Sequence, residues 1–287
     1  MDDGKLRGSP QMKVIDAHQH FWKFDPIREN WINDDMKSIQ KDFLPADLEI
    51  VLNENGIEGS VVVQSDQSEK ENEFQLKNAA EYNFIKGVVG WVDLQAPGIE
   101  EKLVYYKQFK KLKGFRHVLQ GESQRDLMLQ PRFRKGISLL RKYGFTYDIL
   151  IFPDQLVYAN ELVREFPDQL FVLDHIAKPP IKNKKIDEWK KDILALGAHE
   201  NVYCKISGMV TEADWKNWTS DDFIPYIDVA VNAFGTKRIM FGSDWPICLV
   251  AASYSKMKKI VDDYFSFFSK NEQKNFYGKT AIKFYNL

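Results

Sequence analysis

The sequence has no excess charge of either sign and no long apolar run. Its 287 residues carry 40 lysine and arginine side chains against 41 aspartates and glutamates, a formal net charge of −1. Without a basic excess, a protein has little with which to neutralise a phosphate backbone, so we expect no nucleic acid partner. The longest apolar candidate, 247–252, falls far short of the roughly 20 residues that a membrane helix needs. We therefore expect no membrane partner either.

Cysteine is scarce as well. The chain has only Cys204 and Cys248, too few for a disulfide framework, and this fits a reducing compartment. The N-terminal stretch is charged and lacks the apolar centre of a secretory signal, so we predict a cytoplasmic protein. Residues 1–11 contain glycine and proline but little apolar surface. We expect them to be a disordered leader or a stretch foreign to the native protein, and the folded domain to span 12–287.

What the sequence does have is a regular alternation of short apolar runs and longer amphipathic stretches. Runs rich in valine, isoleucine and phenylalanine predict eight strands, at 14–18, 59–64, 86–92, 113–117, 145–150, 170–175, 202–207 and 239–244. Helical spacing of apolar residues predicts helices at 45–55, 71–82, 100–111, 130–143, 155–166, 186–196 and 223–234, with a final helix in 265–287 on the outside. Alternating strands and helices indicate βαβ units and a parallel sheet.

The repeat length distinguishes between two parallel architectures. The ends of the first and eighth predicted strands, His18 and Asp244, are 226 residues apart, or about 32 residues per repeat, which matches an eight-fold barrel of roughly 250 residues. The alternative, an open doubly wound sheet, should carry a glycine-rich phosphate turn after its first strand. This chain reads HQHFW there. We therefore predict an α/β fold with a single (β/α)8 TIM-type barrel.

Polar side chains at the ends of the predicted strands mark the expected active site, because barrels of this kind carry their chemistry at that edge. His18 and His20 are two residues apart, so in extended backbone both rings face one side. His175 ends the sixth strand. Asp244 follows the eighth, where a buried carboxylate needs a cation or imidazoles as partners. The alternatives are hydrogen-bonded core histidines and an Asx turn before Pro246.

Three imidazoles and one carboxylate are compatible with two kinds of chemistry. They suit a divalent transition metal such as zinc or manganese. They equally suit a metal-free site, in which the imidazoles polarise a carbonyl group and the carboxylate activates water. The sequence leaves both open.

Other residues near the strand ends are candidates for contacting a small substrate. Arg116 and His117 are adjacent, so they face opposite sides of a strand, and we expect His117 to point inwards because it ends the run. Lys178, three residues after His175, could reach the rim. Tryptophan faces pack well against the C–H face of a sugar, although ordinary packing explains any single one. The remaining candidates are Gln64, Tyr147, Trp22, Trp31 and Trp91.

Three segments, IDAHQHFW, DHIAKP and FGSDWP, resemble the amidohydrolase superfamily of metallo-dependent hydrolase barrels. The resemblance covers the chain from Val14 to Leu287. With GFRH, it is closer to the sugar-lactone-hydrolysing branch of the amidohydrolase 2 type, which includes L-fuconolactonase and L-rhamnono-lactonase. It implies that His18, His20 and His175 are metal ligands or polarising groups, and that Asp244 is a ligand and the general base.

One departure from the superfamily pattern bears on the metal. Binuclear members carry a bridging carboxylated lysine or a glutamate at the end of the fourth strand and a histidine at the fifth. Here the fourth run ends at Arg116 and His117 and the fifth near Tyr147 and Asp148. The resemblance therefore implies at most one metal, and some members of the branch use none.

The activity implied by the resemblance is hydrolysis of a sugar-acid lactone, an aldono-1,4- or 1,5-lactone similar to L-fuconolactone. Alternatives with the same residue pattern are another amidohydrolase and a metal-dependent decarboxylase of aromatic acids. Asp244 argues against a non-catalytic sugar-acid-binding barrel, which would not need this carboxylate. The expected partner is thus a small lactone. Its stereochemistry and the oligomeric state, a homo-oligomer included, stay open.

Overall fold

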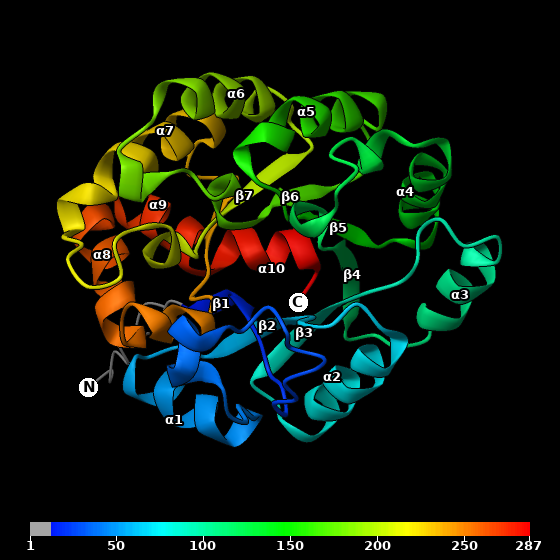
Figure 1. Cartoon of the computed structure of the whole chain (residues 1–287), viewed down its shortest axis with the longest axis horizontal. Coiled ribbons are helices and arrows are strands. Elements are labelled where there is room, and N and C mark those ends of the chain that lie inside the picture. The colour runs from blue at the N-terminus through cyan, green and yellow to red at the C-terminus, as the bar shows by residue number, and fades with distance from the viewer. Residues whose placement is uncertain (1–12) are drawn as a thin grey trace, which may run out of the picture.

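The structure is a computed structural model that describes residues 13–287, and the expected leader at 1–11 lies outside them. Eight strands form one parallel sheet in the order of the sequence, and helices surround it (Figure 1). This confirms the predicted (β/α)8 barrel. No helix among the described residues is both long and apolar enough to cross a bilayer.

The observed elements lie close to the predicted ones. The strands are β1 (Ile15–Gln19), β2 (Gly59–Val63), β3 (Ile85–Gly90), β4 (Leu112–His117), β5 (Thr146–Ile149), β6 (Phe171–Leu173), β7 (Val202–Ile206) and β8 (Ile239–Phe241). The helices are α1 (Pro45–Glu54), α2 (Glu69–Glu81), α3 (Ile99–Tyr106), α4 (Pro131–Tyr143), α5 (Leu156–Glu165), α6 (Asp187–Gly197), α7 (Ile224–Phe234), α8 (Tyr254–Phe265), α9 (Lys270–Lys274) and α10 (Thr280–Tyr285).

The C-terminal region corrects the prediction. The eighth helix of the outer ring is α8, which was not predicted, and its buried face carries Met257, Ile260 and Val261. The tail after it does not form one outer helix. It breaks into α9, a π-helical turn and α10, and α10 crosses the middle of the barrel (Figure 1). Phe284 and Tyr285 of α10 pack against residues such as Ile15 at the start of the strands, so the tail closes the bottom of the barrel.

The barrel closes at the end where the strands have their C-termini, called the upper edge below. Backbone hydrogen bonds join β1 there to the segment after β8. The Asp244 N–H donates to the His18 carbonyl oxygen at 2.8 Å, and the His20 N–H donates to the Trp245 carbonyl oxygen at 2.7 Å. Pairing of β1 with β2 is irregular between Asp16 and Gln19, and such bulges re-aim side chains next to active sites. The same backbone ladder therefore fixes two histidines and a carboxylate that are far apart in sequence.

The chain turns in a left-handed sense after β6. His175, Ile176, Ala177 and Lys178 have φ values of 53°, 47°, 57° and 50°, and each such L-residue costs about 1–2 kcal/mol. This turn ends the strand at Leu173, before the predicted end. Strain of this kind clusters at functional sites, where the surrounding structure has to maintain it.

An ion network fills the interior of the barrel beneath its upper edge. The fully buried Lys205 ammonium lies 2.5 Å from Asp148 Oδ2 and 3.0 Å from Asp174 Oδ1. The Arg116 guanidinium lies 3.1 Å from Asp174 Oδ2. The Tyr285 hydroxyl donates to Asp148 Oδ2 at 2.8 Å. Buried charges persist only when they are paired in this way, so the network ties the C-terminal helix to the strands.

Gly208 supports the left-handed turn, which leads to a first prediction. Its φ is +63°, and a Cβ there would lie 2.6 Å from His175 Nδ1. Gly208→Ala should lower the free energy of unfolding by about 1–2 kcal/mol for the backbone and by about 1–3 kcal/mol more for the displaced ring. The matched control is Gly56→Ala, with φ +67° and nothing within 4 Å of the added Cβ. Equal losses in urea unfolding would contradict the packing argument.

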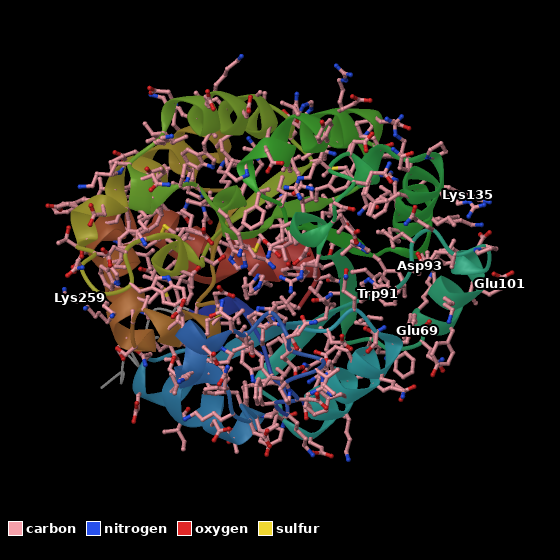
Figure 2. The ribbon with its side chains drawn as sticks, viewed as in Figure 1. Glu69, Trp91, Asp93, Glu101, Lys135 and Lys259 are labelled. Atoms are coloured by element: carbon pink, nitrogen blue, oxygen red, sulfur yellow. The ribbon has the colours of Figure 1, made fainter. Side chains whose placement is uncertain are left out.

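Removal of the Lys205 ammonium tests the ion network. Lys205→Met should lower the free energy of unfolding by about 3–5 kcal/mol, because two buried carboxylates lose the cation that they share. Lys259 lies at the outer edge of the molecule (Figure 2) and pairs with Asp263 at 2.7 Å. Lys259→Met should cost less than about 1 kcal/mol, as exposed pairs do. Comparable losses in denaturant titrations would show that the network contributes no more than a surface pair.

Candidate active site

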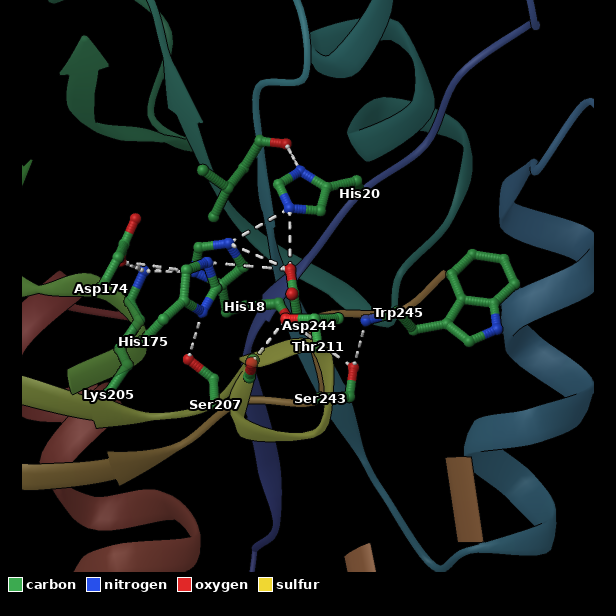
Figure 3. Close-up of polar contacts among 12 residues, drawn as sticks. His18, His20, Asp174, His175, Lys205, Ser207, Thr211, Ser243, Asp244 and Trp245 are labelled. Carbon is green, nitrogen blue, oxygen red and sulfur yellow. Dashed lines mark hydrogen bonds and ion pairs between the residues drawn. The ribbon is translucent and has the colours of Figure 1, made fainter. Parts of the chain in front are cut away.

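The four residues predicted to form the site lie close together, and Figure 3 shows the polar contacts among them. Asp244 Oδ1 lies 3.3 Å from His20 Nε2 and 3.8 Å from the Nε2 atoms of both His18 and His175. The Nε2 atoms of His18 and His20 are 3.2 Å apart. All four side chains are buried. One carboxylate oxygen thus faces three imidazole nitrogens, which come from β1, from the residue directly after it and from the turn after β6.

The far nitrogen of each imidazole has its own partner, which orients the ring. His20 Nδ1 lies 2.8 Å from the Val63 carbonyl oxygen. Because a carbonyl only accepts, this nitrogen carries the proton and Nε2 faces the site with a free lone pair. His175 Nδ1 lies 2.8 Å from the Ser207 hydroxyl, so this ring is also held in place.

The His18 ring is oriented from both sides. Arg116 Nη1 lies 3.3 Å from His18 Nε2, and a guanidinium only donates. Lys205 Nζ lies 3.1 Å from His18 Nδ1, and an ammonium likewise only donates. Asp174 Oδ1 lies 3.3 Å from the same nitrogen. Two cations and one carboxylate thus hold the His18 ring in place.

Burial and neighbouring charges determine the protonation states. Burial lowers the pKa of His20 below its usual value, and lowers those of His18 and His175 well below it. Burial alone would raise the pKa of Asp244, but the His175 and His20 rings outweigh it and the pKa is lowered. At neutral pH the site is therefore an ionised carboxylate among neutral imidazoles. Histidine ligands of a metal have to be neutral, and a carboxylate has to be ionised to act as a ligand or as a general base.

The donor set of the described residues fits a divalent metal. Ligand atoms lie within 4.8 Å of one another in two overlapping groups: His18, His20 and Asp244, and His18, Asp174 and His175. Imidazole nitrogen and carboxylate oxygen are the donors that such metals take. Asp174 was not among the predicted site residues. Its signal in the sequence was a charged residue within the apolar run LFVLDH, directly before His175.

A cavity of about 470 Å³ opens above His20, His175 and Asp244, a size typical of small-molecule sites. Its lining includes the predicted residues His20, His175, Asp244, Arg116, Lys178 and Trp31. It also includes residues that sequence reasoning missed, among them Arg28, Gln67, Gln120, Glu212 and Trp215. These come from loops beyond the strand ends, where neither periodicity nor position marked them.

Arg116, and not His117, points into the barrel, which reverses the expectation. Besides its bonds to Asp174 and His18, Arg116 donates to Gln64 Oε1 at 2.9 Å. His117 faces the opposite way and lies 2.6 Å from Glu122, with its ring against Phe133 of α4. Alternation along β4 decides the orientation, and His117 shares the outer face with Phe115. The position of His117 at the end of the strand does not determine which side the ring faces.

The remaining substrate candidates lie outside the cavity lining. Gln64 is buried behind Arg116. Trp22 is buried, and its indole N–H donates to the Lys41 carbonyl oxygen. The Trp91 indole N–H donates to His117 Nδ1. Tyr147 packs between Phe133 and Phe171 on the helix side of β5. The rings of Trp22, Trp91 and Tyr147 therefore contribute to packing around the barrel.

Comparison with known proteins agrees with this geometry. A family model described as amidohydrolase matches residues 15–287. The chain is 35% identical over 284 residues to an L-fucono-1,5-lactonase of Burkholderia multivorans, covering 95% of this chain and 96% of that protein. It is 33% identical over 243 residues to an L-fucono-1,5-lactonase of Burkholderia ambifaria, covering 84% and 82%.

A solved structure gives the same result in three dimensions. The crystal structure of an amidohydrolase from Burkholderia multivorans with bound zinc superposes with a TM-score of 0.93 at 35% identity, covering 96% of this chain and 99% of that one. The match of the family model to nearly the whole chain, together with these identities, leads to one conclusion. The chain belongs to the amidohydrolase family.

Proposed function

We propose that this protein hydrolyses the ester bond of a sugar-acid lactone, an aldono-1,5- or 1,4-lactone similar to L-fuconolactone. One observation carries the proposal: a single ionised carboxylate, Asp244, faces three oriented imidazoles at the floor of a small-molecule cavity. The names of the related lactonases support the substrate class. A lactone is an activated ester whose leaving group stays attached, so one base and a few donors suffice.

In the proposed mechanism, Asp244 accepts a proton from a water molecule, and the water oxygen attacks the ring carbonyl carbon. Arg116 and His175 line the cavity, and in this proposal they donate to the carbonyl oxygen on which negative charge develops. The C–O bond of the ring then breaks, and Asp244 returns its proton to the departing ring oxygen. The product is the open-chain hydroxy acid. Each donor to the oxyanion contributes about 3 kcal/mol in comparable sites.

One divalent metal, such as zinc or manganese, would be held by His18, His20 and Asp244, whose ligand atoms lie within 4.8 Å of one another, with His175 as the fourth proposed ligand. When bound, such an ion supplies Lewis-acid polarisation of the carbonyl group. Lys205 lies at His18 Nδ1 and Arg116 lies at His18 Nε2, so one cation flanks each side of the ring. These charges disfavour a second metal beside that ring. We therefore propose a mononuclear centre at most. When no metal is bound, the polarising groups are Arg116 and His175, whose Nδ1 can accept from the Ser207 hydroxyl so that Nε2 carries the proton.

The base is tested by Asp244→Asn. This change keeps the size of the side chain but removes the proton acceptor, so kcat for lactone opening should fall by about 10²–10⁴-fold. Because the pKa of Asp244 is lowered, the wild-type activity should not fall as pH drops from neutral towards 5. The control is Asp263→Asn on the surface, with wild-type kcat expected. An Asp244→Asn enzyme with near wild-type kcat and an unchanged melting temperature would exclude Asp244 as the base.

The metal is tested by stoichiometry. Protein dialysed against a chelator and reloaded with zinc should bind no more than one equivalent at the site, measured by elemental analysis. His20→Asn should abolish this binding, because it removes one ligand. If the wild type binds two equivalents of zinc and His20→Asn binds neither, the centre is not mononuclear. Activity of the metal-free protein then tells the two versions of the mechanism apart, and a decarboxylase would show carbon dioxide release that depends on the metal.

A further inference from the structure

One wall of the cavity carries a charge pair that the mechanism does not use. Lys178 Nζ lies 3.5 Å from Glu212 Oε1, and the side chains are only 18% and 21% exposed. Both residues line the cavity beside Asp244. The separation is longer than the roughly 2.7–2.9 Å of a good charge-assisted bond. Both groups therefore keep hydrogen-bonding capacity towards the cavity.

The fold holds Lys178 in this place at a cost in backbone strain. Lys178 is the last of the four left-handed residues after β6, and its N–H donates to the His175 carbonyl oxygen at 2.8 Å. In a turn with three residues per repeat, residues three apart lie on the same side. The turn that brings His175 to Asp244 thus also brings Lys178 to the cavity. Phe152 flanks the ammonium, with its ring centre 5.7 Å from Nζ.

Glu212 shares the cavity lining with an oriented aromatic ring. It ends the turn Met209–Glu212 after β7, and burial raises its pKa while Lys178 acts in the opposite direction. The indole N–H of Trp215 donates to the Thr211 carbonyl oxygen at 2.8 Å, which fixes the ring in the cavity lining. A carboxylate that accepts two bonds, an ammonium that donates and an indole face are complementary to a ring with adjacent hydroxyls and an apolar C–H face.

The chemistry of this wall also works against the wrong substrate. A lactone without hydroxyl groups would displace water from Lys178 and Glu212 and offer them nothing in return. Sites that leave buried polar groups unpaired discriminate strongly against such analogues. The wall therefore selects for hydroxyl groups and does not merely tolerate them.

We propose that Lys178 and Glu212 are the specificity-determining residues of the site, with Glu212 accepting hydrogen bonds from adjacent ring hydroxyls and Lys178 donating to one of them. The substrate class is then a polyhydroxylated lactone ring. The proposal rests on the proposed lactonase function. It assigns these two side chains to substrate selection and none of the bond-breaking chemistry to them.

The test compares two lactones that share one ring. L-Fucono-1,5-lactone carries ring hydroxyls, whereas δ-valerolactone has the same six-membered ester without them. Wild-type kcat/KM should favour the hydroxylated ring by about 100-fold or more, and Glu212→Gln and Lys178→Met should each reduce that preference by about 10-fold or more. Glu161→Gln, which removes a surface carboxylate paired with Arg134, should keep the wild-type preference.

The possible failures are distinguishable. If the kcat/KM of either variant falls by the same factor for both lactones, its residue acts on the structure or on the chemistry. The proposal is then overturned while the lactonase function stands. A wild-type enzyme without preference for the hydroxylated ring overturns it as well. If the wild type opens neither this pair nor any other lactone, the proposed function itself fails. Melting temperatures of both variants identify a loss that comes from unfolding.

Discussion

The ionised Asp244 carboxylate, buried among three neutral imidazoles, is the interaction on which the rest of the structure depends. A carboxylate that is 3% exposed would normally take up a proton or be expelled to solvent. Here the rings of His20 and His175 keep its pKa low. The backbone ladder between His18 and Asp244 and the left-handed turn at His175 bring these groups to one point.

The ion network behind the site determines what Asp244 can do. Lys205 and Arg116 carry two positive charges, and Asp148 and Asp174 can balance them with two negative ones. Within this group the charge cancels, and Asp244 is left as the net charge at the floor of the cavity. A proton from water or a divalent cation is what such a site attracts. The same network holds the His18 ring in place and reaches the Tyr285 hydroxyl near the C-terminus, so the same contacts contribute to fold stability and to the geometry of the site.

The barrel and the four central residues could be predicted because both depend on local signals. Strand periodicity and repeat length do not need tertiary contacts, and His18, His20, His175 and Asp244 sit where strands end. Other features depend on packing across the chain. Side chains alternate along β4, and His117 packs against α4, so the neighbouring Arg116 points into the barrel. The tail covers the bottom of the barrel because Phe284 and Tyr285 pack on an apolar surface there. No local pattern in the sequence singles out Lys205, Glu212 or Trp215, because their contacts are with residues on other strands and loops.

The most direct test of the account is a pH-drop assay of the purified protein over a panel of aldono-1,4- and 1,5-lactones. Each lactone is measured with chelated protein and with zinc-loaded protein, and the rate is compared with spontaneous opening. The account predicts acid release well above the spontaneous rate for at least one hydroxylated lactone in at least one of the two forms. Failure of both forms to accelerate the opening of any lactone in the panel would contradict it.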